Sequence, residues 1–140
     1  MIAAAVLTGA LLVSPATAPA TGSETVRPSV YVGQHYAPRW EPWRKCVVWR
    51  ESRDNPRAAN KRSSARGLYQ FLDRSWRRSL TYMLMPEHRD RRAEVLALRA
   101  QPIHHWPRYW QDAAFWTVLD RGKGARHWAA QRTRCGQVRP

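Results

Sequence analysis

Hydrophobic residues recur three and four positions apart along much of the chain, a spacing that keeps side chains on one face of an α-helix. In the first such stretch, Trp43, Val47 and Glu51 are four residues apart and therefore share a face. This pattern predicts a helix over residues 42–52. Further helices are expected over 73–85, where Asp73 has the chemistry of an N-cap, over 87–99, from 107 to 122 or 124, and around 127–130.

The polar stretch 53–66 separates the first two predicted helices. It carries turn signals at Asp54-Asn55-Pro56 and at Lys61-Arg62-Ser63-Ser64. These signals predict a short hairpin-like excursion that leads into the strip 68–71. The expected fold class is therefore mainly α, a small helical domain with a short β or irregular excursion between helices one and two.

A chain of 140 residues has room for one domain, which is expected over residues 40–136. Residues 21–39 show no sustained hydrophobic period and are expected to form a flexible leader, and 137–140 a tail. Residues 1–20 combine an apolar run with small residues in the A-x-A pattern of a secretory signal peptide. No other segment is apolar for long enough to span a membrane, so a secreted protein is expected.

The chain is strongly basic, with 24 Lys and Arg against 10 Asp and Glu and a net charge of +14. Such a charge attracts polyanions: nucleic acid, anionic membranes and cell walls that carry teichoic acid. A nucleic-acid-binding domain concentrates its arginines on one face. Here they are spread along the chain, which argues against a specific nucleic-acid partner.

The cysteine and histidine pattern gives no sign of a metal site. Cys46 and Cys135 are the two cysteines. In an oxidising compartment they could form one disulfide, worth on the order of 4 kcal/mol, and in the cytosol they would remain two buried thiols. The histidines lack ligand spacing, and neither a glycine-rich phosphate loop nor a nucleophile elbow occurs, so no metal and no cofactor is predicted.

Glu51 is the residue that the helical pattern makes unusual. A glutamate on an apolar stripe is desolvated, which favours its protonated form, as a general acid requires. The alternative is a residue at a frayed helix end that faces water. Glycosidic cleavage usually needs a second carboxylate. Asp54 and Asp73 are already explained as turn and cap residues, which leaves a single-acid mechanism in which the substrate supplies the nucleophile.

A composite pattern in the first half of the chain resembles a known group. It runs Cys46-x4-Glu51-Ser52-x7-Asn60-x6-Gly67-Leu68-Tyr69-Gln70-Phe71-x4-Trp76. It is similar to the catalytic region of resuscitation-promoting factors and soluble lytic transglycosylases, which have the lysozyme-like α+β fold and act on peptidoglycan. Gln111-x2-Ala114-Phe115-Trp116, Gly122-x-Gly124, His127-Trp128 and Cys135 look like that group's C-terminal helix and closing cysteine.

The resemblance implies a role for each matching position. Glu51 matches the catalytic acid and Ser52 the residue that supports it. Arg53-Asp54 departs from the pattern, because related sequences carry glycines there, and the charged segment 87–99 looks like an insertion. The substrate-binding residues implied by the match are Ser52, Asn60, Gly67, Tyr69 and Gln70.

The leading hypothesis is a monomeric peptidoglycan-cleaving lytic transglycosylase or muramidase. It would cut the β-1,4 bond between N-acetylmuramic acid and N-acetylglucosamine, with anionic wall polymers as further partners. It would act outside the cell, or be phage-encoded and act on the host wall. The alternative is a non-catalytic module that binds peptidoglycan or a wall polymer, and a third hypothesis is a basic nucleic-acid-associated protein.

Overall fold

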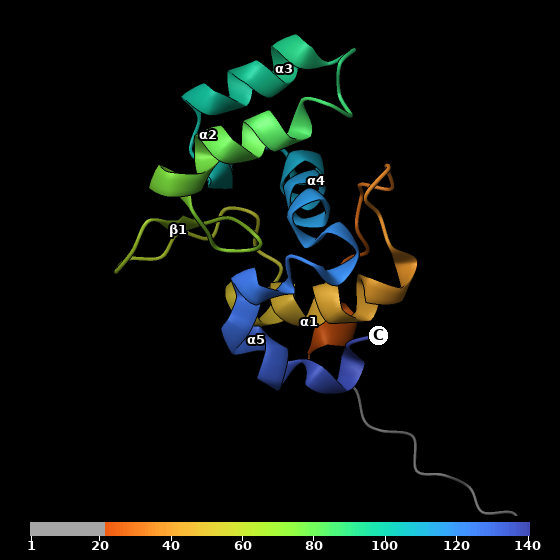
Figure 1. The fold of residues 1–140 in the computed structure, drawn as a ribbon. Helices are drawn as coiled ribbons and strands as arrows, with labels where there is room; N and C mark the ends of the chain where they lie inside the picture. The colour runs from red at the N-terminus through yellow and green to blue at the C-terminus, as the bar shows by residue number, and fades with distance from the viewer. Residues whose placement is uncertain (1–21) are drawn as a thin grey trace, which may run out of the picture.

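A computed structural model describes residues 22–140, and this part of the chain forms five α-helices with a small antiparallel hairpin at one side (Figure 1). The predicted signal peptide lies outside the described residues. The helices are α1 (Glu41–Ser52), α2 (Asp73–Leu84), α3 (Arg92–Ala97), α4 (Arg108–Leu119) and α5 (Ala129–Arg134), and the strands are β1 (Ala65–Arg66) and β2 (Phe71–Leu72). The mainly α fold class with a short β excursion after the first helix is thus confirmed.

Helix α4 is the centre of the core. Its residues from Trp110 to Leu119 are all buried, including the polar Gln111 and Asp112. Figure 1 shows α4 between the α2–α3 pair and the helices α1 and α5. A helix that is apolar on nearly every side must be covered all round, which explains why the other elements gather about it.

Helix α1 carries the predicted apolar stripe into this core. Trp43 and Val47 are fully buried, and Glu51, one turn further on, is half-buried. The helix ends at Arg53, whose φ of 55° is left-handed, and Asp54 follows with a φ of 61°. Glycine is the residue that adopts this conformation without steric cost, so Arg53 and Asp54 hold a backbone geometry that is uncommon for their types.

The hairpin follows a long polar loop. Ala65 pairs with Leu72 and Arg66 with Phe71, and a further bridge joins Ala59 to Arg66. Residues 67–70 form its turn, with positive φ at Gly67 (79°) and Gln70 (50°).

Helix α2 begins at Asp73 as expected, but Asp73 does not cap it. Leu72 occupies the cap position and makes no side-chain capping bond. The Asp73 carboxylate instead accepts a hydrogen bond from the Ile103 backbone N–H (2.8 Å) and pairs with Arg77. It therefore joins the start of α2 to the loop that precedes α4.

The helix predicted over 87–99 is shorter in the structure: residues 87–91 are not helical, α3 begins at Arg92, and the 3₁₀ turn Leu98–Ala100 follows it. Only Val95 and Leu98 of α3 and this turn are buried, as the dense charge of the segment predicted.

The predicted leader is packed onto the domain from residue 22 onward, which corrects the boundary expected at 40. Val26 and Tyr31 are buried. The Val30 N–H donates to the Asp112 carboxylate (2.9 Å), and the Trp116 indole N–H donates to the Ser29 hydroxyl (2.9 Å). The segment is held by isolated hydrogen bonds with side chains of α4, and such contacts leave no periodic signal in the sequence. The predicted tail likewise continues a 3₁₀ turn, Gly136–Val138.

Cys46 and Cys135 form a disulfide with a Cα–Cα distance of 5.9 Å. The bridge closes a loop across 89 positions and ties α1 to the end of α5. None of the helices in the described range has the length and apolar character needed to cross a membrane.

Reduction of this disulfide is expected to lower the free energy of unfolding by about 4 kcal/mol, because the unfolded chain regains the entropy of an open loop. Urea unfolding with and without dithiothreitol measures the change. The Cys46→Ser/Cys135→Ser variant serves as the control, since it should be equally unstable in both conditions. An unchanged midpoint in protein whose thiols titrate as reduced would contradict the expectation.

Candidate active site

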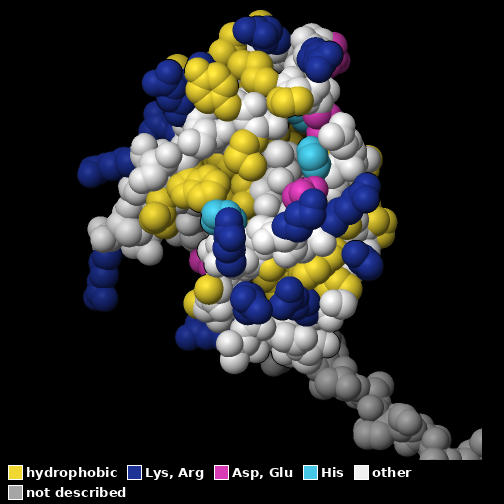
Figure 2. All heavy atoms as spheres, in the orientation of Figure 1, with side chains coloured by type: hydrophobic (Ala, Val, Ile, Leu, Met, Phe, Trp, Pro, Cys, Tyr) yellow, Lys and Arg dark blue, Asp and Glu magenta, His cyan; other side chains and the backbone are white. Residues whose placement is uncertain are grey.

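Glu51 opens into a cleft of about 210 Å³ between α1, the hairpin, the start of α2 and the turn before α5. Figure 2 shows hydrophobic side chains gathered at the surface on this side of α2, with a histidine beside them. The cleft is lined by Glu51, Tyr69, Gln70, Phe71, Leu72, Trp76, His127 and Trp128.

The environment of the Glu51 carboxyl favours its protonated form. Burial raises the pKa of Glu51, and the hydrogen bond from Gln131 and the charge of Arg134 oppose that rise only in part. The Gln131 amide donates to Glu51 Oε1 at 3.1 Å. One oxygen is thus held in place by α5, while the side chain remains at the surface of the cleft.

Aromatic rings form the walls around this carboxyl. Trp76 is half-buried and meets the His127 ring edge-on, with 4.6 Å between centroids. Phe71 packs against Trp128 at 5.6 Å. Burial and the neighbouring Arg126 lower the pKa of His127, which keeps this ring neutral over a wider pH range. An acid among aromatic faces is an arrangement suited to a sugar ligand, since apolar ring faces can stack on it.

Gln70 is the predicted binding residue that the structure brings beside Glu51. Its backbone is left-handed, and its amide donates to the Gly67 carbonyl at 2.9 Å. This internal hydrogen bond fixes the side chain as part of the cleft wall.

Tyr69 also borders the cleft, but its side chain points into the core. It is 1% exposed, its hydroxyl donates to Asp112 Oδ1, and it accepts a hydrogen bond from Arg44 at 2.9 Å. Its predicted role in binding the substrate is therefore corrected to a structural one: the residue fixes the turn that carries Gln70.

Gly67 is likewise buried beneath the turn rather than open to a ligand. A Cβ at this position would lie 2.4 Å from Gln111 Oε1, which accepts the Leu68 N–H at 2.8 Å. Glycine is required here by a positive φ and by this close approach.

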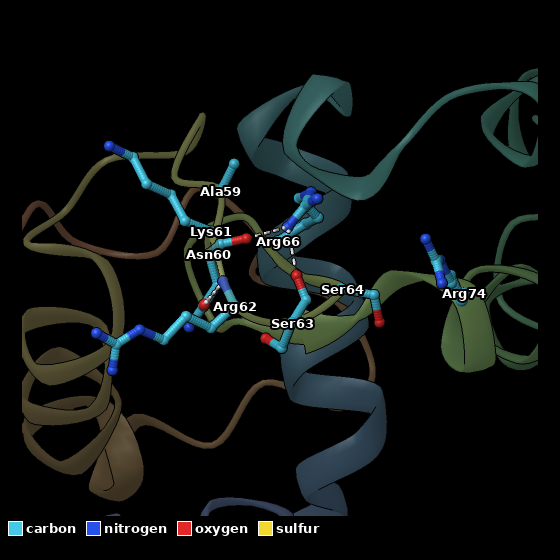
Figure 3. Close-up of a pocket in the computed structure, with 8 residues that line it drawn as sticks. All are labelled: Ala59, Asn60, Lys61, Arg62, Ser63, Ser64, Arg66 and Arg74. Atoms are coloured by element: carbon cyan, nitrogen blue, oxygen red, sulfur yellow. Dashed lines mark hydrogen bonds between the residues drawn. The ribbon is translucent and has the colours of Figure 1, made fainter.

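Ser52 and Asn60 lie outside the cleft. The Ser52 hydroxyl is buried and donates to the Val48 carbonyl of the preceding turn (3.2 Å), so it does not reach Glu51. The Asn60 side chain accepts the Arg62 N–H (2.8 Å). It belongs to a different hollow, termed here the basic pocket, which is lined by Ala59, Asn60, Lys61, Arg62, Ser63, Ser64, Arg66 and Arg74 (Figure 3).

The sequence patterns assign no binding role to Trp76, His127, Trp128 or Gln131, although the first three line the cleft and Gln131 contacts Glu51. A usable signal was present. His127 and Gln131 are four residues apart, so that they share a face if the helix is continuous, and Cys135 follows four residues later. A disulfide from Cys135 to α1 brings that face toward Glu51.

Neither predicted alternative carboxylate lines the cleft. Asp54 is paired with Arg27 (2.9 Å) and Arg108 (2.7 Å). Burial raises its pKa, but the hydrogen bonds from these arginines outweigh burial and lower the pKa overall. The pKa of Asp73 is lowered in the same way, by Arg77 and the Ile103 N–H against the effect of burial. Both are stable carboxylates committed to structural partners.

Across residues 22–140, no three His, Cys, Asp or Glu side chains lie close enough together to hold a metal ion. The fold and the cleft define a small, mainly helical, disulfide-bonded domain with one half-buried acid among aromatic side chains. Comparison with protein-family models, with curated proteins and with solved structures gives no match.

Tyr69→Phe is expected to lower the free energy of unfolding by about 2 kcal/mol, because the buried groups of Asp112 and Arg44 lose a hydrogen-bond partner. Urea unfolding measures this loss. Tyr82→Phe is the matched control, since Tyr82 is 53% exposed, and it should change stability little. Unaltered stability of Tyr69→Phe together with weaker glycan binding would restore the substrate-binding role.

Proposed function

We propose that this protein is a peptidoglycan-cleaving glycosidase of the lytic transglycosylase or muramidase type, with a lysozyme-like domain. The observation that carries the proposal is the half-buried Glu51 carboxyl in an aromatic cleft, where burial raises its pKa. The motif residues Glu51 and Gln70, distant in sequence, both line this cleft, which supports the resemblance on which the substrate assignment rests.

The cleft offers what the first half of glycosidic cleavage needs. Protonated Glu51 donates its proton to the leaving glycosidic oxygen, and the bond to the muramic acid anomeric carbon breaks. The resulting carboxylate is stabilised by the Gln131 amide, which already donates to Oε1. A raised pKa matters here because the acid must hold its proton until the leaving oxygen takes it.

The second half needs a nucleophile and a base. Among the described residues no second carboxylate lines the cleft, and the ionised Glu51, which has just given up its proton to the leaving oxygen, takes a proton from the attacking hydroxyl. When that hydroxyl is the muramic acid 6-OH, the product is a 1,6-anhydro end and Glu51 returns to its protonated state. When it is water, the product is a reducing end. The single acid favours the intramolecular reaction, because the nucleophile is then part of the substrate.

The aromatic walls would position the sugar. Trp76 and His127 present rings at the mouth of the cleft, and Gln70 presents an amide edge. The same features would serve a module that binds the glycan without cleaving it, which is the alternative that the first experiment separates.

Glu51→Gln is expected to reduce clearing of purified peptidoglycan in a zymogram by roughly a hundredfold or more, because amide cannot donate the catalytic proton. Glu24→Gln, an exposed glutamate outside the cleft, is the matched control and should clear like wild type. Mass spectrometry of the released muropeptides should show anhydro ends. Equal clearing by Glu51→Gln would exclude Glu51 as the acid, and glycan binding without released fragments would establish the binding module.

The same variant tests folding separately from chemistry. Burial raises the pKa of Glu51 in the folded state. The free energy of unfolding therefore falls as the pH rises through that pKa, because the buried site disfavours the ionised carboxylate. Glu51→Gln removes this penalty and should unfold at no lower urea concentration than wild type at neutral pH. Loss of activity in a well-folded variant is then a loss of the acid.

Gln131→Leu should move the alkaline limb of the pH–activity profile to higher pH. The Gln131 hydrogen bond lowers the pKa of Glu51, so its removal raises that pKa further and keeps the acid protonated at higher pH. The kcat/KM profile on soluble glycan fragments measures the shift, and Gln137→Leu, at an exposed glutamine, is the control. An alkaline limb that stays in place or moves downward contradicts this account.

A further inference from the structure

The basic pocket is a second hollow, of about 540 Å³, formed by the polar loop before β1 and the first turn of α2. Its volume falls in the range of ligand sites, and no acidic residue lines it. It shares no lining residue with the cleft of Glu51. Arg74 and Trp76 are two positions apart on α2 and so lie about 200° apart around the helix, which directs the pocket and the cleft to different faces.

The pocket is shaped by the loop itself. Arg66 donates through Nη1 to the carbonyls of Asn60 (2.9 Å), Ser63 (3.1 Å) and Ala65 (2.8 Å). The Asn60 and Ser63 side chains also accept backbone N–H groups of the loop, from Arg62 and Ala65. Figure 3 shows the hydrogen bonds from Arg66 to Asn60 and Ser63. The backbone of the loop that lines the hollow is therefore held in place by its own hydrogen bonds.

Three further cations around the pocket have no acidic partner. Lys61, Arg62 and Arg74 are exposed and form no ion pair with any residue of the described range 22–140. In Figure 3, Lys61 and Arg62 extend from the loop and Arg74 rises from α2 across the hollow. Because these three charges line one hollow and none is neutralised by a carboxylate among the described residues, they are available to an anionic ligand.

A second basic hollow, of about 400 Å³, adjoins the first through Arg74 and is lined by Asp73, Arg74, Arg77, Arg78 and Arg99. Arg78 and Arg99 lie over the ring of Tyr82, with 5.8 and 4.3 Å to its centroid. Two hollows that share one arginine suit a ligand that is long and repeatedly charged better than a single small anion.

We propose that the basic pocket binds a phosphodiester-bearing polyol polymer of the cell wall, of the teichoic acid type, and so holds the protein on the wall while the cleft acts on the glycan. The choice of a wall polymer as the ligand rests on the proposed function, in which the substrate is peptidoglycan. Arginine forks bind phosphate, and the serine and asparagine residues of the rim match a hydroxyl-rich chain. No aromatic side chain lines the basic pocket to stack a nucleobase, which disfavours single-stranded nucleic acid as the occupant.

The test uses the full chain and purified poly(glycerol phosphate), with binding followed by titration at fixed ionic strength. Lys61→Ala/Arg62→Ala/Arg74→Ala should weaken binding about tenfold, since three exposed charge contacts are lost. Arg39→Ala/Arg89→Ala/Arg92→Ala is the matched control. It removes the same charge from exposed residues that form no ion pair in the described range and line neither hollow, and it should bind within about twofold of wild type.

Two further arms separate this inference from the proposed function. On peptidoglycan stripped of its phosphate polymer, the pocket variant should release fragments at the wild-type rate, whereas Glu51→Gln should not. On walls that retain the polymer, the pocket variant should sediment less than wild type. If Glu51→Gln retained full activity, the proposed catalytic role of Glu51 would be wrong. The measured affinity for the polymer would still test the basic pocket.

Several results would overturn the inference. Equal weakening by both triple variants would mean that net charge, not the pocket, attracts the polymer. A single-stranded oligonucleotide of equal phosphate content that binds more tightly than the polymer, and depends on the same three residues, would assign the pocket to nucleic acid. Wild type that sediments equally with stripped and unstripped walls would exclude a role for the polymer.

Discussion

The buried hydrogen-bond network of Arg44, Tyr69 and Asp112 is the interaction on which the arrangement of this domain depends. Arg44 is fully buried, donates to the Tyr69 hydroxyl at 2.9 Å and lies 3.7 Å from Asp112 Oδ1. It also donates to Glu41 (2.7 Å) and to the Arg27 carbonyl (2.6 Å). Desolvating a guanidinium and a carboxylate costs several kcal/mol, and only a complete set of partners offsets that cost. Because these partners come from α1, the hairpin turn, α4 and the N-terminal segment, the network is complete only when all four are in place.

This requirement explains how the cleft is positioned. Glu51 lies seven residues after Arg44, two helical turns along nearly the same side of α1, and Gln70 directly follows Tyr69. Fixing Arg44 against Tyr69 therefore fixes the acid relative to the wall that faces it. The remaining wall belongs to the turn before α5, which the disulfide from Cys46 holds to α1 and the Trp128 indole holds to the Tyr69 carbonyl (3.1 Å). Glu51 lies between the wall fixed by the Arg44 network and the wall fixed by the disulfide and Trp128, and it belongs to neither set of contacts.

The sequence predicted the features that repeat or that follow from local turn chemistry, and it could not predict those made by single long-range contacts. Helical spacing placed α1, α2 and α4 to within a few residues. The turn residues of 53–66 predicted a β excursion after α1, although the turn of the observed hairpin lies at 67–70. The N-terminal segment was not predicted because the Val30 N–H is held by Asp112, 82 positions away.

Tyr69 was assigned to the substrate for a related reason: a motif gives the identity of a residue next to the cleft but not the direction of its side chain. Arg53 and Asp54 broke the glycine pattern, yet the left-handed turn forms, with Asp54 held by Arg27 and Arg108 and Arg53 stacked 4.5 Å from the centroid of Trp49.

The separation of the cleft from the basic pocket also bears on how an acid can function in so basic a protein. A cation near Glu51 stabilises the carboxylate and works against a raised pKa, as Arg134 already does. Charge interactions at the surface fade over a Debye length of about 8 Å at physiological ionic strength. Attraction to an anionic wall, in contrast, depends on the charge of the whole molecule and on where unpaired cations gather. Lys61, Arg62 and Arg74 surround a hollow on a different face of α2 from Trp76. This separation would let the surface attract an anionic polymer while burial continues to dominate the pKa of Glu51.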